Sequence, residues 1–106
     1  MAIQLEHHQI ELRSRVDEVL HYIWDPIGVA GVPEARDEYY SYITPIFDFL
    51  LEGKTQNEIS KTLLDMSTGH MGLTYSKELK KRTEQASEVL IRWTKIIQAQ
   101  DDYHTK

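Results

Sequence analysis

Apolar residues in the first part of the chain follow the spacing of one helical face. They are Leu12, Val16, Val19, Leu20 and Ile23, at positions i, i+4, i+7, i+8 and i+11. This pattern predicts a helix from about residue 5 or 9 to residue 24. The helix should end at Asp25, because the residue before a proline is pushed out of helical geometry.

The stretch after this helix is a loop of mixed character. Residues 26–33 contain two prolines and two glycines, together with Ile27, Val29 and Val32. Because an apolar loop gains stability by packing, we expect it to lie against the body of the domain.

A second helical pattern begins near Pro33, a residue type that is favoured in the first turn of a helix. Its apolar stripe consists of Tyr39, Ile43, Ile46 and Leu50, joined by Tyr42, Phe47 and Leu51. Pro45 lies inside the pattern and should produce a kink or a break into two pieces. Gly53 is placed to terminate the helix.

Two further helices follow. Thr55 and Glu58 form a capping box, which predicts a third helix that ends around Gly69. Ser76 can cap a fourth helix of roughly 25 residues, whose length of about 37 Å would brace the other three. Its stripe is Leu79, Thr83, Ala86, Leu90, Trp93 and Ile97.

No segment alternates polar and apolar residues as a strand does. The sequence therefore predicts an all-α fold, a four-helix antiparallel bundle with a kinked second helix and a long C-terminal helix, formed by residues 1–106 as one domain.

Composition narrows the classes of protein. The chain has no cysteine, which excludes disulfides, thiolate metal sites and a cysteine nucleophile. It also has neither an apolar run long enough to span a membrane nor a signal-peptide pattern near its start, so we expect a soluble cytoplasmic protein with no membrane partner.

The acidic charge is concentrated in one half of the chain. The formal net charge is −5, but residues 1–52 hold ten acidic residues against three arginines, and residues 53–106 hold seven against nine basic residues. This distribution argues against direct binding of nucleic acid, which requires clustered basic side chains. It favours a basic protein partner.

The residues that could bind a metal or act in catalysis lack the partner residues that such sites need. Glu18 and His21 form a single Glu-x-x-His pair, whereas a dimetal bundle needs two such pairs, so we interpret them as a surface pair or a half-buried histidine. His70 could act as a base, but with no catalytic motif nearby we interpret it as a helix C-terminal residue. We therefore expect no catalytic residue, no metal and no cofactor.

The strongest signal for function is an acidic face on the second helix. Its carboxylates are Glu34, Asp37, Glu38, Asp48 and Glu52, and residues 22–49 also hold seven of the ten aromatic residues. One interpretation is a solvated acidic face over an aromatic core. The other is a docking surface for a basic protein, formed by Glu34, Asp37, Glu38, Tyr40 and Asp48, with Tyr40 as its aromatic contact.

Short motifs add a family resemblance over roughly residues 16–73. They are Trp-Asp-Pro-Ile-Gly-Val at 24–29, Glu-Ala-Arg-Asp-Glu-Tyr at 34–39, Tyr42, Pro45 and His-Met-Gly-Leu at 70–73. These segments resemble a family of small bacterial proteins of unclassified function. Small acidic proteins of this kind often serve as immunity proteins beside polymorphic or contact-dependent growth inhibition toxins, and the resemblance implies that role.

Two hypotheses from different classes follow. In the first, the chain is an immunity protein that blocks a toxin domain, such as a nuclease, by occupying its basic cleft. In the second, it is a housekeeping helical adaptor or a homo-oligomer that associates through the loop Ile27–Val32 or through the fourth helix. Asp25 is expected to act as a turn residue before Pro26.

Overall fold

The computed structural model describes residues 6–104, and the side chains of that range through residue 100. It is all-helical, and no strand occurs within residues 6–104. The α-helices are α1 (His7–Val19), α2 (Tyr40–Leu51), α3 (Gln56–Asp65) and α4 (Lys77–His104). Three short turns complete the elements: the π-helical turns η1 (Leu20–Trp24) and η3 (Met66–His70), and the 3-10 turn η2 (Pro33–Ala35).

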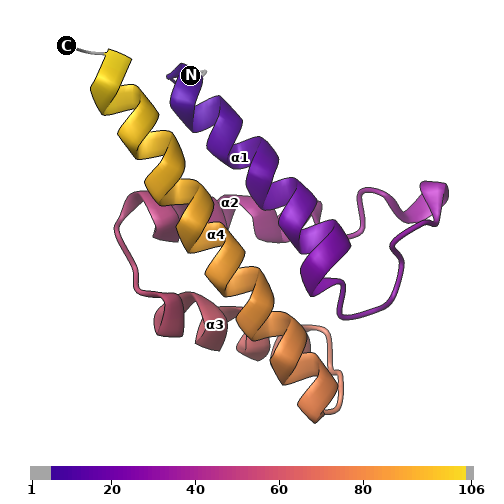
Figure 1. The fold of residues 1–106 in the computed structure, drawn as a ribbon. Coiled ribbons are helices and arrows are strands. Elements are labelled where there is room, and N and C mark those ends of the chain that lie inside the picture. The colour runs from indigo at the N-terminus through magenta and orange to yellow at the C-terminus, as the bar shows by residue number, and fades with distance from the viewer. Residues whose placement is uncertain (1–5, 105–106) are drawn as a thin grey trace.

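The four helices form a bundle around the long helix α4. In Figure 1, α1 and α4 lie side by side and run in opposite directions, while α2 and α3 cross behind them. α4 packs against α1, α3 and, over a smaller area, α2. The predicted four-helix architecture with a long C-terminal helix is therefore confirmed, with α4 reaching 28 residues.

The helix starts follow the predicted capping residues. The Thr55 hydroxyl accepts a hydrogen bond from the Glu58 N–H at 3.2 Å, and the Glu58 carboxylate accepts one from the Thr55 N–H at 3.1 Å. The Ser76 hydroxyl accepts from the Leu79 N–H at 3.0 Å at the start of α4. Both predicted caps are confirmed.

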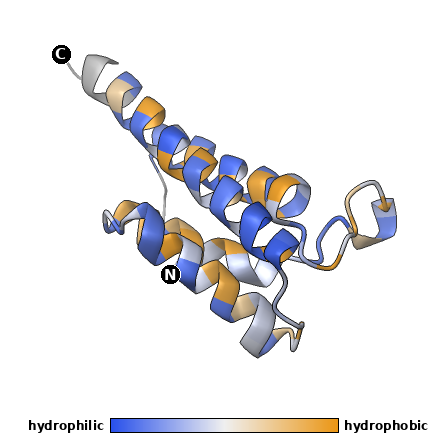
Figure 2. Cartoon of the chain, turned by 60° about the horizontal axis from the view of Figure 1, so that its bottom comes forward, coloured by the Kyte–Doolittle hydropathy of each residue, from blue (hydrophilic) through white to orange (hydrophobic). Residues whose placement is uncertain are grey.

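One continuous core fills the space between the helices. Its fully buried members include Val16, Leu20, Trp24, Ile46, Ile59, Leu63 and Leu90. Figure 2 shows hydrophobic residues along the inward sides of the helices and hydrophilic residues on their outward sides, as the periodic pattern requires. No helix within residues 6–104 is long and apolar enough to cross a membrane.

The predicted face of the first helix is confirmed, since Leu12, Val16, Val19 and Leu20 are buried and Ile23 packs against the core, but the last turn is not α-helical. The Asp25 N–H donates to the carbonyl of Leu20, five residues earlier, at 3.0 Å, so the last turn is wider than an α-helical turn. This turn rotates Trp24 into the core and leaves Ile23 only partly buried. His21 is buried as well, although the helix period did not place it on the core face; its neighbours are Tyr39, Val32 and other residues of the segment that follows.

The second helix begins later than its sequence pattern predicts. Residues 33–39 form η2 and a series of tight turns with hydrogen bonds between residues three apart, and α2 starts only at Tyr40. Pro45 lies within α2, which continues through it. Of the two outcomes expected at Pro45, a kink or a break, the break into two pieces does not occur, and the interruption of the predicted helix lies before Tyr40.

Candidate functional site

Residues 25–39, called here the projecting loop, extend away from the helices at one side of the molecule in Figures 1 and 2. The loop begins at Asp25, which has φ 32° and ψ 59°. A residue other than glycine seldom adopts this left-handed conformation, and asparagine and aspartate tolerate it best. The loop therefore starts from a backbone geometry that other contacts must stabilise.

Those contacts come from the buried carboxylate of Asp25. Its Oδ1 accepts from the Val29 N–H and from the Tyr39 hydroxyl, both at 2.7 Å, and its Oδ2 accepts from the Ala30 N–H at 3.1 Å. The Asp25 carbonyl oxygen accepts from Arg82 Nη1 of α4 at 3.0 Å. One residue therefore joins the first half of the loop, its last residue and the longest helix. Asp25 is a turn residue, as expected. Its hydrogen-bond partners lie four and five residues later in the chain and, for Tyr39 and Arg82, much further along.

These hydrogen bonds also set the ionisation of Asp25. Burial raises the pKa of its carboxyl group, but the donors Tyr39, Val29 and Ala30 stabilise the carboxylate and lower the pKa overall. Tyr39 shifts the other way, because burial and the neighbouring Asp25 carboxylate both disfavour a phenolate and raise its pKa. The Tyr39 hydroxyl stays protonated, donates to Asp25 and accepts from the Ile27 N–H at 3.0 Å.

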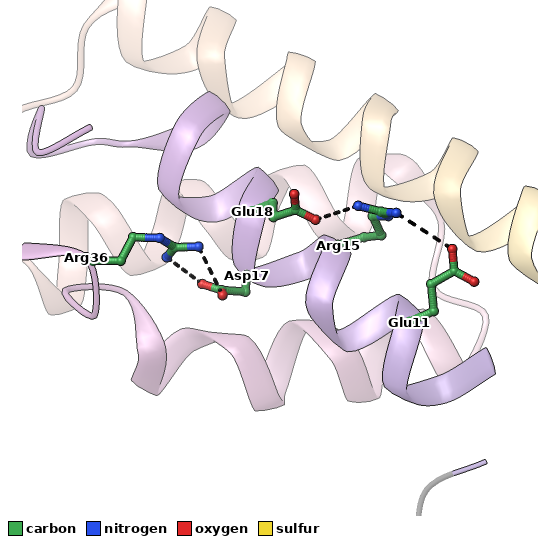
Figure 3. A network of polar contacts seen from close by, with 5 residues as sticks. All are labelled: Glu11, Arg15, Asp17, Glu18 and Arg36. Carbon is green, nitrogen blue, oxygen red and sulfur yellow. Dashed lines mark hydrogen bonds and ion pairs between the residues drawn. The ribbon is translucent and has the colours of Figure 1, made fainter. Parts of the chain in front are cut away.

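A second connection ties the far part of the loop to α1. Arg36 donates to both carboxylate oxygens of Asp17, at 2.9 and 3.2 Å, and its guanidinium lies 5.4 Å from the ring centroid of Tyr22. Its hydrogen bonds to Asp17 raise the pKa of Arg36. Figure 3 shows this bidentate pair, the geometry in which arginine binds a carboxylate best.

Nearby acidic residues of α1 are also paired. Arg15 contacts Glu18 at 2.7 Å and Glu11 at 3.8 Å, as Figure 3 shows, and its guanidinium lies 4.4 Å from the ring centroid of Trp93. The carboxylates of α1 are thus partly neutralised by the arginines of the acidic half of the chain. The unpaired carboxylates of the first half lie on other elements.

The residues predicted to bind a partner carry unpaired negative charge. Glu34 is in η2, Asp37 and Glu38 are in the turns that follow, Tyr40 is the first residue of α2, and Asp48 is two turns further along that helix. All five side chains are exposed, and within the described part of the chain none of the four carboxylates forms an ion pair. They do not form one face of one helix, as the sequence suggested, because residues 33–39 are not part of α2.

Exposed apolar side chains lie on or beside the same loop. Tyr22 is 59% exposed, Tyr40 52%, Ile27 46% and Val32 43%. We expected the apolar residues to pack onto the domain, and only Val29 of the three packs against the core. The projecting loop therefore combines unpaired carboxylates with uncovered apolar surface, the mixture found in protein interfaces.

Of the two histidine interpretations, the one for Glu18 and His21 is wrong and the one for His70 is confirmed. His21 is 2% exposed and not a surface or half-buried residue, and Glu18 pairs with Arg15 instead of His21. His70 does stand at the end of a helical segment, but its Nδ1 lies 2.6 Å from the Tyr42 hydroxyl, so its ring partner is a side chain of α2. Among the side chains of residues 6–100, no three histidine or carboxylate groups converge in a way that could hold a metal ion.

Sequence reasoning missed His21, Arg36 and Tyr39 as residues that shape this surface. Arg36 and Tyr39 lie inside the motif at residues 34–39, and Arg36 is the sole lysine or arginine between positions 16 and 53. A single arginine in a segment rich in carboxylates could have indicated that it forms an ion pair. His21 gave no such signal, because the residues around it, such as Val32 and Tyr39, lie more than ten positions further along the chain.

Comparison with protein-family models, curated proteins and solved structures yields no significant match. The family resemblance therefore rests on the motifs quoted above.

Replacement of Asp25 by asparagine tests the role of the loop junction. In Asp25→Asn the side chain would keep one acceptor oxygen but would turn an amide towards N–H and O–H donors, so we expect a loss of about 1–3 kcal/mol in the free energy of unfolding at neutral pH. Chemical denaturation followed by circular dichroism measures this loss. Asp48→Asn is the matched control, and its exposed, unpaired carboxylate should change stability by less than about 0.5 kcal/mol.

The same variant should alter the pH dependence of stability. Because the pKa of Asp25 is lower in the folded than in the unfolded chain, its stabilisation is complete above the unfolded pKa and is lost as the pH falls towards the folded pKa. The wild type should therefore lose stability below about pH 4, and Asp25→Asn should lose less there. Parallel pH curves for the two proteins would contradict this account.

Proposed function

We propose that this chain is a cytoplasmic immunity protein that binds a cognate bacterial toxin domain and blocks it by occlusion. The observation that carries the proposal is a fixed loop with unpaired carboxylates at Glu34, Asp37 and Glu38 beside exposed aromatic residues. Tyr40 and Asp48 extend this surface onto α2. No reaction, metal or cofactor is assigned to the chain.

The chemistry of the surface supports a basic partner. Unpaired carboxylates accelerate the encounter with a positively charged surface and disfavour acidic partners. A nuclease must carry a basic, phosphate-binding cleft, so an acidic loop can fill that cleft and exclude nucleic acid. Stoichiometric occlusion of this kind needs no catalytic group in the inhibitor.

The internal contacts of the loop support affinity. A flexible loop must lose conformational entropy when it binds, whereas a loop already fixed by Asp25 and by the Arg36–Asp17 pair loses less. Exposed tyrosines such as Tyr40 are common among residues that contribute most to binding. The loop therefore suits tight inhibition better than a mobile acidic tail would.

Coexpression with the toxin domain encoded beside it tests this function. We expect protected growth and a one-to-one complex that co-purifies, because occlusion requires a stable stoichiometric complex. Growth curves and size-exclusion chromatography provide the readouts. Undiminished toxicity together with no complex would refute the proposal.

Charge reversal tests which surface binds. Asp37→Lys should slow association with the toxin domain by about threefold to tenfold and weaken its dependence on salt, because steering by opposite charge is reduced. Surface plasmon resonance at several salt concentrations measures both effects. Asp65→Lys makes the same charge change at an exposed position at the end of α3 and should leave the association rate nearly unchanged.

Asp48→Lys, measured in the same series, decides whether α2 belongs to the surface. A rate like that of the Asp65 control would restrict the surface to the projecting loop. Equal association rates for the wild type and Asp37→Lys would show that the projecting loop does not belong to the binding surface either.

The alternative function, a homo-oligomer without a toxin partner, is favoured by the exposed side chains of Ile27 and Val32. It predicts light scattering at twice the monomer mass of 12.4 kDa at micromolar concentration. Val32→Asp should then restore the monomer, whereas Ile96→Asp on α4 should not if the loop is the interface. A monomer at all concentrations would exclude this alternative.

A further inference from the structure

A cavity of about 360 Å³ lies between the end of α1 and the far part of the projecting loop. It is lined by His21, Tyr22, Gly31, Val32, Pro33 and Arg36. Its volume is near the lower end of the range for pockets that bind small molecules. It also adjoins Glu34 and Asp37, which flank two of its lining residues in the chain.

His21 supplies an unsatisfied polar group at this cavity. The residue is 2% exposed, and its Nδ1 is buried without a hydrogen-bond partner within the described residues. Its ring contacts are aromatic: the Tyr22 ring meets it edge to face at 4.5 Å and the Tyr39 ring lies 6.4 Å away. A buried polar atom without a partner is costly and uncommon, so a ligand that supplies the partner gains binding energy.

His21 belongs to an unusual backbone feature. His21 and Trp24 both lie in the wide turn η1 and are both buried, and π-helical turns occur frequently at functional sites. A neutral imidazole has one acceptor nitrogen, and either ring nitrogen takes that role according to the tautomer. A donor that enters the cavity can therefore find an acceptor in this ring.

The other walls restrict the charge and shape of the occupant. Arg36 repels a cation, and both of its terminal nitrogens already bind Asp17, so an anion finds its expected partners occupied. Tyr22, Val32 and Pro33 provide apolar and aromatic surface. The walls therefore favour a neutral, flat, largely apolar group with one hydrogen-bond donor.

We propose that this cavity receives a tyrosine side chain of the protein partner, whose phenol hydroxyl donates to a ring nitrogen of His21. The inference rests on the proposed function in assigning the phenol to a protein, and it names the group that this partner must present. The ring of the tyrosine packs against Val32 and Pro33, near the guanidinium of Arg36. The acidic residues of the loop surround this contact and attract the basic surface that carries it.

Small analogues test the chemistry of the cavity without a partner. The full chain, labelled with nitrogen-15, is titrated with p-cresol, which is the tyrosine side chain, and with 4-methylanisole, which has the same ring and oxygen but no donor. We expect p-cresol to shift the amide signals of Tyr22, Gly31 and Val32 and to bind about threefold to tenfold more tightly than 4-methylanisole. Equal affinities, or no shifts at these residues, would overturn the proposal and leave the cavity to water.

Variants then test the role of the histidine. His21→Phe keeps a planar ring and removes both nitrogens, so p-cresol should lose its advantage while the affinity for 4-methylanisole stays the same. His70→Phe removes an exposed imidazole elsewhere and should keep the advantage of p-cresol. Retention of that advantage in His21→Phe would overturn the proposal. If His21→Phe does not fold, the comparison of the two analogues on the wild type still decides the matter.

The toxin domain distinguishes a partner's tyrosine from a free phenolic molecule. In the complex, His21→Phe should speed dissociation by about threefold to tenfold with little change in association, the reverse of the effect expected for Asp37→Lys. An unchanged dissociation rate would overturn the assignment to a protein partner. Failure of protection in coexpression would refute the immunity function but leave the analogue titration valid, so the two failures are distinguishable.

Discussion

The carboxylate of Asp25 is the constraint on which the binding surface depends. It accepts hydrogen bonds from two backbone N–H groups of the loop and from the hydroxyl of Tyr39, while its own carbonyl accepts from Arg82. These bonds compensate for a left-handed backbone conformation and for the burial of a charge. Because the donors belong to both ends of the projecting loop and to α4, Asp25 links the two ends of the loop to each other and to the longest helix.

Some carboxylates of the protein are paired with arginines and others are not. The net charge of −5 conceals a strongly acidic first half, and the structure divides that half again. Glu11, Asp17 and Glu18 on α1 are paired with arginines, and Asp25 is buried among donors. The carboxylates that remain unpaired on the loop are therefore the ones that can act on a partner, which a count along the sequence does not distinguish.

Much of the fold could be predicted from the sequence because local signals determine it. Apolar periodicity located the helices, and the side chains of Thr55 and Ser76 marked two helix starts correctly. The predictions failed at two places, the wide turn after Val19 and the tight turns before Tyr40. In the tight turns, Arg36 and Tyr39 contact Asp17 and Asp25, which are distant in sequence. Composition singled out the exposed carboxylates of the loop, whose role in binding stays a prediction, but it gave no sign of the cavity, which forms where the far part of the loop meets η1.

In the proposed complex the loop and the cavity would contact the partner in different ways, and both depend on the same internal contacts. Unpaired carboxylates act at long range and govern the rate of encounter, while a buried acceptor such as His21 acts only on contact and governs the lifetime of a complex. The Arg36–Asp17 pair serves both, since it holds the loop in place and removes the free positive charge from the cavity wall. A protein of 106 residues has little surface available, and a loop fixed by two polar connections would let one segment provide both attraction and selectivity in the proposed complex.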